Sequence, residues 1–114
     1  MADVPAQRRR YPRYSTETDL TVYAGGKSLR ARITQVSRGG CLIYPPLALE
    51  QGNDLRLSFQ LSDGLSPINC KGEIVYNIQS LGTGIAFTEI SIYNQDRITE
   101  FFRSQGKAEI PAGS

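Results

Sequence analysis

The sequence contains no histidine among its 114 residues. That absence excludes Ser-His-Asp and Cys-His catalysis and any metal site with histidine ligands. Two cysteines, Cys41 and Cys70, are too few for a zinc site of four sulfurs. No apolar run approaches the ~20 residues of a membrane-spanning helix, and no apolar stretch follows the basic N-terminal residues as it would in a signal peptide. We therefore expect a small, soluble, cytoplasmic domain that is not an enzyme and holds neither a metal nor a cofactor.

The composition is that of one folded domain. Apolar residues make up 39% of the chain and charged residues 21%, which excludes a disordered chain. A domain of 114 residues buries enough apolar surface to fold without a disulfide or a metal. Both cysteines fall in apolar stretches, so we expect them to be buried free thiols.

Positive charge is concentrated at the front of the chain. Residues 1–38 hold eight of the 13 Lys and Arg residues against three acids, whereas the remainder holds five against eight. This asymmetry predicts an anionic partner, and the alternative is a basic tail that only aids solubility. Within it, residues 8–14 read Arg-Arg-Arg-Tyr-Pro-Arg-Tyr. Pro12 disfavours helical backbone at Tyr11, so we expect an extended arm here, after an unstructured tail over residues 1–7.

Strand patterns dominate after the arm. Between residues 27 and 36, Leu29, Ala31 and Ile33 alternate with polar residues, as in a strand with one buried face. Gly25-Gly26 and Asp63-Gly64 are hairpin turns by their composition. Strands are expected over residues 17–24, 27–36, 41–44, 54–61, 67–78 and 85–87, with further turns at 37–40 and 82–84. Short strands at this spacing favour an all-β fold, a small antiparallel barrel.

The last element has a helical period. Ser91 is a suitable N-cap, and Gly106 is a suitable stop. The expected apolar stripe of this helix consists of Ile90, Tyr93, Ile98, Phe101 and Phe102. We expect the helix to cover an end or a seam of the barrel, and residues 107–114 to form a loose tail.

Two motifs carry the chemistry of the sequence. One is Arg9-x-x-x-Arg13 in the arm, and the other, separated from Arg13 by 21 residues, is the segment Gln35-Val36-Ser37-Arg38-Gly39-Gly40. In this order and all-β setting the chain resembles the PilZ family of bacterial cyclic di-GMP receptors. The family pattern is Arg-x-x-x-Arg followed by Asp or Asn, x, Ser, x, x, Gly. The later Gly82-x-Gly84-x-x-Phe87, followed by a helix, also resembles the closing strand of the family.

The resemblance implies a six-stranded antiparallel β-barrel with one C-terminal helix, spanning residues 8–105 and followed by a tail over 106–114. It also implies a ligand, cyclic di-GMP, and roles for the motif residues. Arginine binds phosphate oxygens and the guanine edge bidentately, so Arg9 and Arg13 would hold both. Ser37 would offer a hydroxyl, and glycine would let the backbone approach closely. The expected ligand-binding residues are Arg8, Arg9, Arg10, Arg13, Gln35, Ser37, Arg38, Gly39 and Gly40.

Position 35 departs from the family pattern. Asp accepts from guanine N1–H and N2–H together, whereas Gln offers one neutral oxygen and is one methylene longer. A lost hydrogen bond to a charged group costs roughly 1.5–3 kcal/mol, or about 10- to 150-fold in affinity. Gln35 therefore predicts weakened binding.

Three functions stay open at this point. The first is a cyclic di-GMP receptor whose Arg arm becomes ordered over the ligand and which then signals to an effector protein in trans, in motility or biofilm regulation. The second is a PilZ-like adaptor that binds only protein, because Gln35 replaces Asp or Asn. The third is a barrel that binds single-stranded nucleic acid through a basic arm with aromatics. The net charge of only +2 argues against the third.

Overall fold

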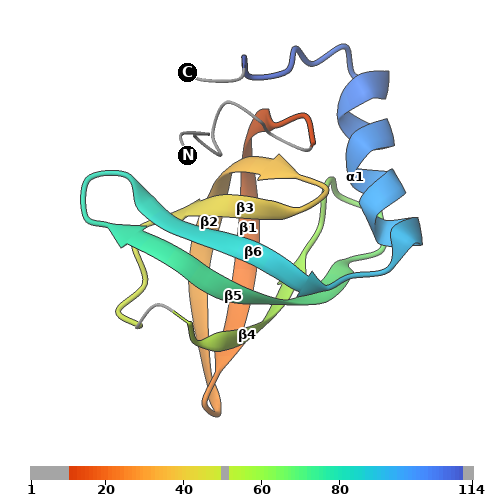
Figure 1. Ribbon diagram of the computed structural model, residues 1–114. Coiled ribbons are helices and arrows are strands. Elements are labelled where there is room, and N and C mark those ends of the chain that lie inside the picture. Colours follow the sequence, from red (N-terminus) through yellow and green to blue (C-terminus); the bar gives the residue numbers. More distant parts are fainter. Residues whose placement is uncertain (1–10, 50–51, 112–114) are drawn as a thin grey trace, which may run out of the picture.

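Six strands and one helix make up the computed structural model, which describes residues 11–49 and 52–111. The elements are β1 (Tyr14–Ala24), β2 (Lys27–Ser37), β3 (Gly40–Tyr44), β4 (Asp54–Phe59), β5 (Ile68–Ile78), β6 (Gly82–Glu89) and α1 (Ile92–Ser104). All strand pairs are antiparallel, and the strands close into a barrel in the order β1-β2-β3-β6-β5-β4 (Figure 1). The expected all-β barrel with a C-terminal helix is confirmed.

The barrel interior holds the core. Along β4, Leu55, Leu57 and Phe59 are buried, while the residues between them are not. Burial of each such side chain stabilises the fold by about 1.5–3 kcal/mol. The barrel closes where β1 pairs with β4, with Leu20 opposite Phe59. Cys41 and Cys70 are buried free thiols, as expected.

Several strand boundaries differ by one to three residues from those expected, among them those of β1 and β4. β1 begins at Tyr14 rather than at residue 17, because Tyr14 and Ser15 pair with Val36 and Gln35 of β2. Tertiary pairing thus extends the strand into the basic arm. β4 ends at Phe59 rather than at residue 61.

The turn expected at residues 82–84 is wrong, because these residues belong to β6. The Thr83 hydroxyl is fully buried, donates to Asn77 Oδ1 at 2.7 Å and accepts from the Leu47 N–H at 2.8 Å. A side chain at residue 84 would overlap the ring of Tyr76 on the neighbouring strand. The glycine serves close packing within the sheet instead of a turn.

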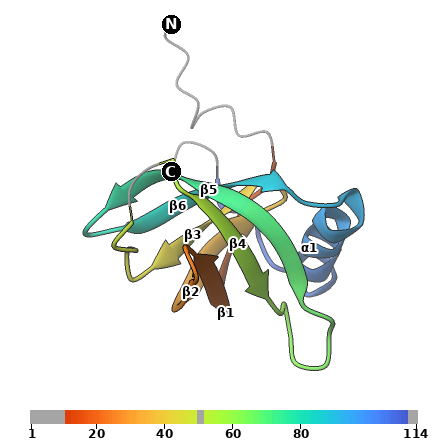
Figure 2. The same ribbon diagram turned by 90° about the horizontal axis from the view of Figure 1, so that it is seen from below.

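The helix α1 begins and ends as the sequence predicts. Ser91 Oγ accepts from the Asn94 N–H at 3.0 Å, and Gly106, with a φ of +69°, follows the last turn. Ile98 and Phe102 are buried as expected, but Tyr93 is 72% exposed. The expected place of Tyr93 in the apolar stripe is wrong, because its ring lies on the solvent side of α1 near the Arg97 guanidinium, 5.8 Å from the ring centroid, and not in the core. Figure 2 shows α1 beside the ring of strands.

The residues after α1 differ from the expected loose tail. The Lys107 N–H donates to the Phe102 carbonyl at 3.0 Å, and the Ile110 N–H donates to the Arg13 carbonyl at 2.7 Å. The chain up to Pro111 therefore returns to the base of the basic arm, at the end of the barrel where α1 lies (Figure 1). Among residues 11–49 and 52–111, no helix is long and apolar enough to cross a membrane.

Candidate functional site

The turn between β2 and β3 is held in a fixed shape. The Gly39 N–H donates to Ser37 Oγ at 3.1 Å, and the Phe87 N–H of β6 donates to the Gly39 carbonyl at 2.9 Å. A side chain at Gly40 would collide with the backbone carbonyl of Ile85. Glycine at position 40 is thus required by the close approach of β3 and β6, in addition to any role at a ligand.

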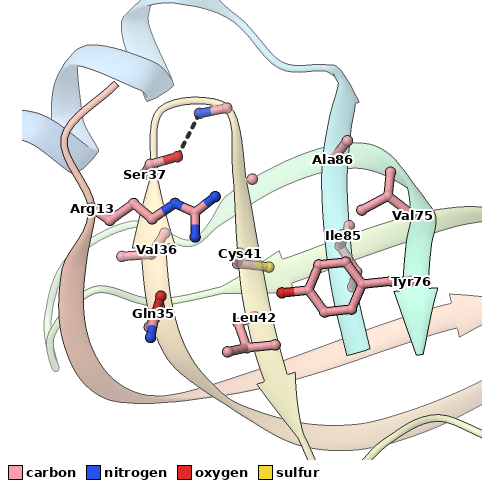
Figure 3. Close-up of a pocket in the computed structure, with 12 residues that line it drawn as sticks. Arg13, Gln35, Val36, Ser37, Cys41, Leu42, Val75, Tyr76, Ile85 and Ala86 are labelled. Atoms are coloured by element: carbon pink, nitrogen blue, oxygen red, sulfur yellow. Dashed lines mark hydrogen bonds between the residues drawn. The ribbon is translucent and has the colours of Figure 1, made fainter. Parts of the chain in front are cut away.

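A pocket of about 190 Å³ opens beside this turn (Figure 3). It brings together five of the expected site residues, Arg13, Gln35, Ser37, Gly39 and Gly40. Strands β2, β3, β5 and β6 and Arg13 of the arm, just before β1, contribute to its wall. Pockets that enclose a small ligand are usually about 300–1,000 Å³. A dinucleotide would therefore place only a part of itself in this pocket and lie across the surface with the rest.

Arg13 has a hydrogen-bonded backbone, and its side chain has no partner among the residues that the structure describes. Its carbonyl accepts from Ile110, and the next residue, Tyr14, stacks on Phe102 at 5.1 Å between ring centroids. The Tyr11 ring packs against Gly39, with a ring carbon 3.0 Å from where a Cβ would lie. Among the described residues, none forms a hydrogen bond or ion pair with the Arg13 guanidinium. A partly buried, unpaired guanidinium beside a pocket is well placed to bind an anion.

Gln35 lines the same pocket from β2, next to a register shift between β2 and β3 at residues 33–35. Its side-chain amide has no hydrogen-bond partner within residues 11–49 and 52–111. Both the amide oxygen and the amide nitrogen are therefore free to bond a ligand. Gln35 thus lies in the same pocket as Arg13 and Ser37, and its contact with a ligand stays a prediction.

The far wall of the pocket consists of Val75 and Tyr76 of β5, which the sequence analysis did not identify. Figure 3 shows Tyr76 and Arg13 reaching toward each other from opposite sides of Cys41. Tyr76 pairs with Gly84, and the missing side chain of Gly84 makes room for its ring. Tyr76 comes close to Gln35 and Ser37 only through the pairing of β5 with β6. The alternation of polar and apolar residues along the sequence therefore could not identify Tyr76 as a pocket residue.

Arg38 does not line this pocket. Its guanidinium Nη1 donates to Asp96 Oδ1 of α1 at 2.6 Å, and its side chain is 24% exposed. Arg8, Arg9 and Arg10 lie outside the described residues. Their contact with a ligand stays a prediction, and so does that of Arg38.

Both cysteine thiols are buried, and Cys41 lines the pocket. Burial raises the pKa of the Cys41 thiol far above its ordinary value of 9.0, and burial raises that of Cys70 to about 12. Both thiols are protonated at neutral pH, and a protonated thiol is a poor nucleophile. Within the described part of the chain, no three His, Cys, Asp or Glu residues are grouped as metal ligands.

Comparisons with known proteins agree with the fold. In structure the chain is similar to the Bacillus subtilis inhibitor of motility MotI (DgrA), with a TM-score of 0.72 at 20% identity, covering 86% of this chain and 51% of that one. It is also similar to the PilZ domain of YcgR from Escherichia coli, solved with c-di-GMP, with a TM-score of 0.62 at 17% identity, covering 85% and 90%. The chain spans about half the length of MotI.

No curated protein matches the sequence significantly. The family model described as PilZ domain matches residues 7–104. This match covers most of the chain and includes the arm, the β2–β3 turn and α1. The chain therefore belongs to the PilZ domain family.

Proposed function

We propose that this domain is a cyclic di-GMP receptor that binds the nucleotide between the basic arm and the β2–β3 turn. The observation that carries the proposal is the pocket in which Arg13, Gln35 and Ser37 meet, although 21 residues separate Arg13 from Gln35 in the sequence. PilZ domain proteins are receptors and adaptors rather than enzymes, and the inert thiols of this chain agree with that role.

The chemistry of the pocket suits one end of the ligand. The Arg13 guanidinium would bind a phosphate or the O6/N7 edge of a guanine bidentately. Gln35 would accept from the guanine N1–H or N2–H, and the Ser37 hydroxyl, which accepts from Gly39, would still donate its own proton to a phosphate. The phenol of Tyr76 closes the opposite side.

The arm would cover the part of the ligand that the pocket leaves exposed. Arg9, four residues before Arg13, and its neighbours Arg8 and Arg10 would supply the further positive charge. Ordering of this arm would change the surface that the domain presents to an effector protein, so the domain would act in trans. The effector is defined here only as a protein that binds the ligand-bound form more tightly than the free form.

Isothermal titration with cyclic di-GMP tests this proposal. We expect saturable binding that Arg13→Ala abolishes or weakens at least tenfold, because a charge-assisted bidentate contact is lost. Arg56→Ala is the matched control, because Arg56 on β4 lines other grooves and not this pocket. Wild-type protein that gives no heat of binding, or equal affinities for wild type and Arg13→Ala, would refute the proposal.

A second function is a PilZ adaptor that binds only protein, and Gln35 is the observation that favours it. In that case partner binding would not depend on the nucleotide, and Arg13→Ala would bind the partner as wild type does. The same titration separates the two functions, because the adaptor predicts no binding of cyclic di-GMP by the wild type.

A further inference from the structure

Arg38 belongs to the segment 35–40, but its side chain lies against α1 and not in the pocket. Arg38 Nη1 donates to Asp96 Oδ1 at 2.6 Å and to Thr99 Oγ1 at 3.5 Å. Thr99 is only 8% exposed, so this contact lies partly under the helix. Residues 96 and 99 are one helical turn apart and present one face of α1 to the same guanidinium.

The backbone of the same residue is also bound to α1. Gln95 Nε2 donates to the Arg38 carbonyl at 2.9 Å, while the neighbouring Gly39 carbonyl accepts from Phe87 of β6. The turn is therefore fixed between α1 on one side and β6 on the other. Ser37 and Gly39, on either side of Arg38, line the pocket. A movement of α1 would move these pocket residues with it.

The helix and the segment after it also hold the other half of the site. Phe102 stacks on Tyr14 with the ring planes 12° apart, and Ile110 bonds the Arg13 carbonyl. The arm and the β2–β3 turn are separate in the sequence, but both are bonded to α1 or to the segment that follows it.

We propose that Arg38 is a positioning residue, which fastens the β2–β3 turn to α1 through Asp96, Thr99 and Gln95 and does not touch the ligand. This inference rests on the proposed function. Nucleotide binding and the packing of α1 against the turn are then linked. If this packing raises the affinity for the nucleotide by some factor, bound nucleotide stabilises the packing by the same factor. Ligand binding would thereby change how firmly α1 packs. The first residues of α1, Ile92 and Tyr93, are 71% and 72% exposed and lie on the surface that this change would affect.

Asp96→Asn is the discriminating variant, measured by titration with cyclic di-GMP. If Arg38 positions the turn, the variant binds at least about fivefold more weakly, the lower end of typical coupling. If Arg38 instead binds a phosphate, releasing it from Asp96 leaves affinity unchanged or raises it, and that result overturns the proposal. Glu100→Gln is the matched control, because Glu100 pairs with Arg103 on the same helix and should bind as wild type does.

Charge reversal supplies a second test. Arg38→Asp and Asp96→Arg should each weaken binding, and the double variant should recover affinity, because the pair is restored with its ends exchanged. A direct contact of Arg38 with phosphate predicts that the double variant stays as weak as Arg38→Asp alone, and that result would count against the proposal.

The ligand-free protein separates this inference from the proposed function. In Asp96→Asn, the amide resonances of Gly39 and Gly40 should shift or broaden, whereas those of the Gly25-Gly26 hairpin should not move. Unchanged Gly39 and Gly40 resonances overturn the positioning role whether or not any nucleotide binds. A wild-type domain that binds no cyclic di-GMP overturns the proposed function, and these spectra still decide the role of Arg38.

Discussion

Gln35→Asp is expected to tighten cyclic di-GMP binding. Gln35 lies in the pocket beside Ser37, and its amide has no partner among the described residues, so the substitution breaks no hydrogen bond that the structure shows. A hydrogen bond to a charged acceptor contributes about 1.5–3 kcal/mol, against about 0.5–1.5 kcal/mol for a neutral one. The gain is therefore about 1–1.5 kcal/mol, which lowers Kd about five- to tenfold.

Two further variants separate charge from length in this prediction. Gln35→Asn shortens the side chain without adding a charge, and Gln35→Glu adds the charge at the original length. We expect Gln35→Asp to bind tightest and Gln35→Asn to gain little, because the charge carries most of the difference. Isothermal titration at constant ionic strength gives the four values of Kd. Equal affinities for Gln35→Asp and wild type, or for Gln35→Asn and Gln35→Asp, would show that charge at position 35 does not control the affinity.

Three predictions concern stability and are checked by urea unfolding. Gly84→Ala should cost about 1–3 kcal/mol, because the new methyl group would overlap the Tyr76 ring; a wild-type midpoint would contradict this packing. Phe102→Ala should cost about 3–5 kcal/mol, because Phe102 is 1% exposed, and a loss under 1 kcal/mol would contradict its place in the core. Cys41 and Cys70 stay protonated in the folded protein well above the ordinary thiol pKa of 9.0. The unfolded chain ionises first, so the free energy of unfolding should fall between about pH 9 and 12, by up to ~1.4 kcal/mol per pH unit for each thiol. Replacing both cysteines by alanine should remove this fall in the free energy of unfolding with pH. The same fall in the variant as in the wild type would show that the buried thiols do not cause it.

Local patterns were enough to predict most elements of the barrel. Alternation identified the buried face of β4, paired glycines located the β1–β2 hairpin at Gly25-Gly26, and Ser91 marked the start of α1. Each of these features depends on residues close together in the sequence, so the sequence alone could show them.

Features that depend on distant pairing could not be predicted in this way. The glycines of β6 look like a turn until the Tyr76 ring is placed against Gly84. Residues 107–111 look like a tail until Ile110 meets Arg13, about a hundred positions earlier. Position 38 lies in the ligand motif, yet its side chain is bonded to Asp96 of α1. These contacts exist only after the barrel closes.

Backbone amide chemical shifts during titration with cyclic di-GMP show whether the nucleotide binds at the β2–β3 turn. We expect the largest shifts at Arg13, Gln35 and Gly39. We expect no change in the groove near Tyr23 and Arg56, which is separate from this pocket. Shifts confined to that groove, or none anywhere at saturating nucleotide, would contradict binding at this turn.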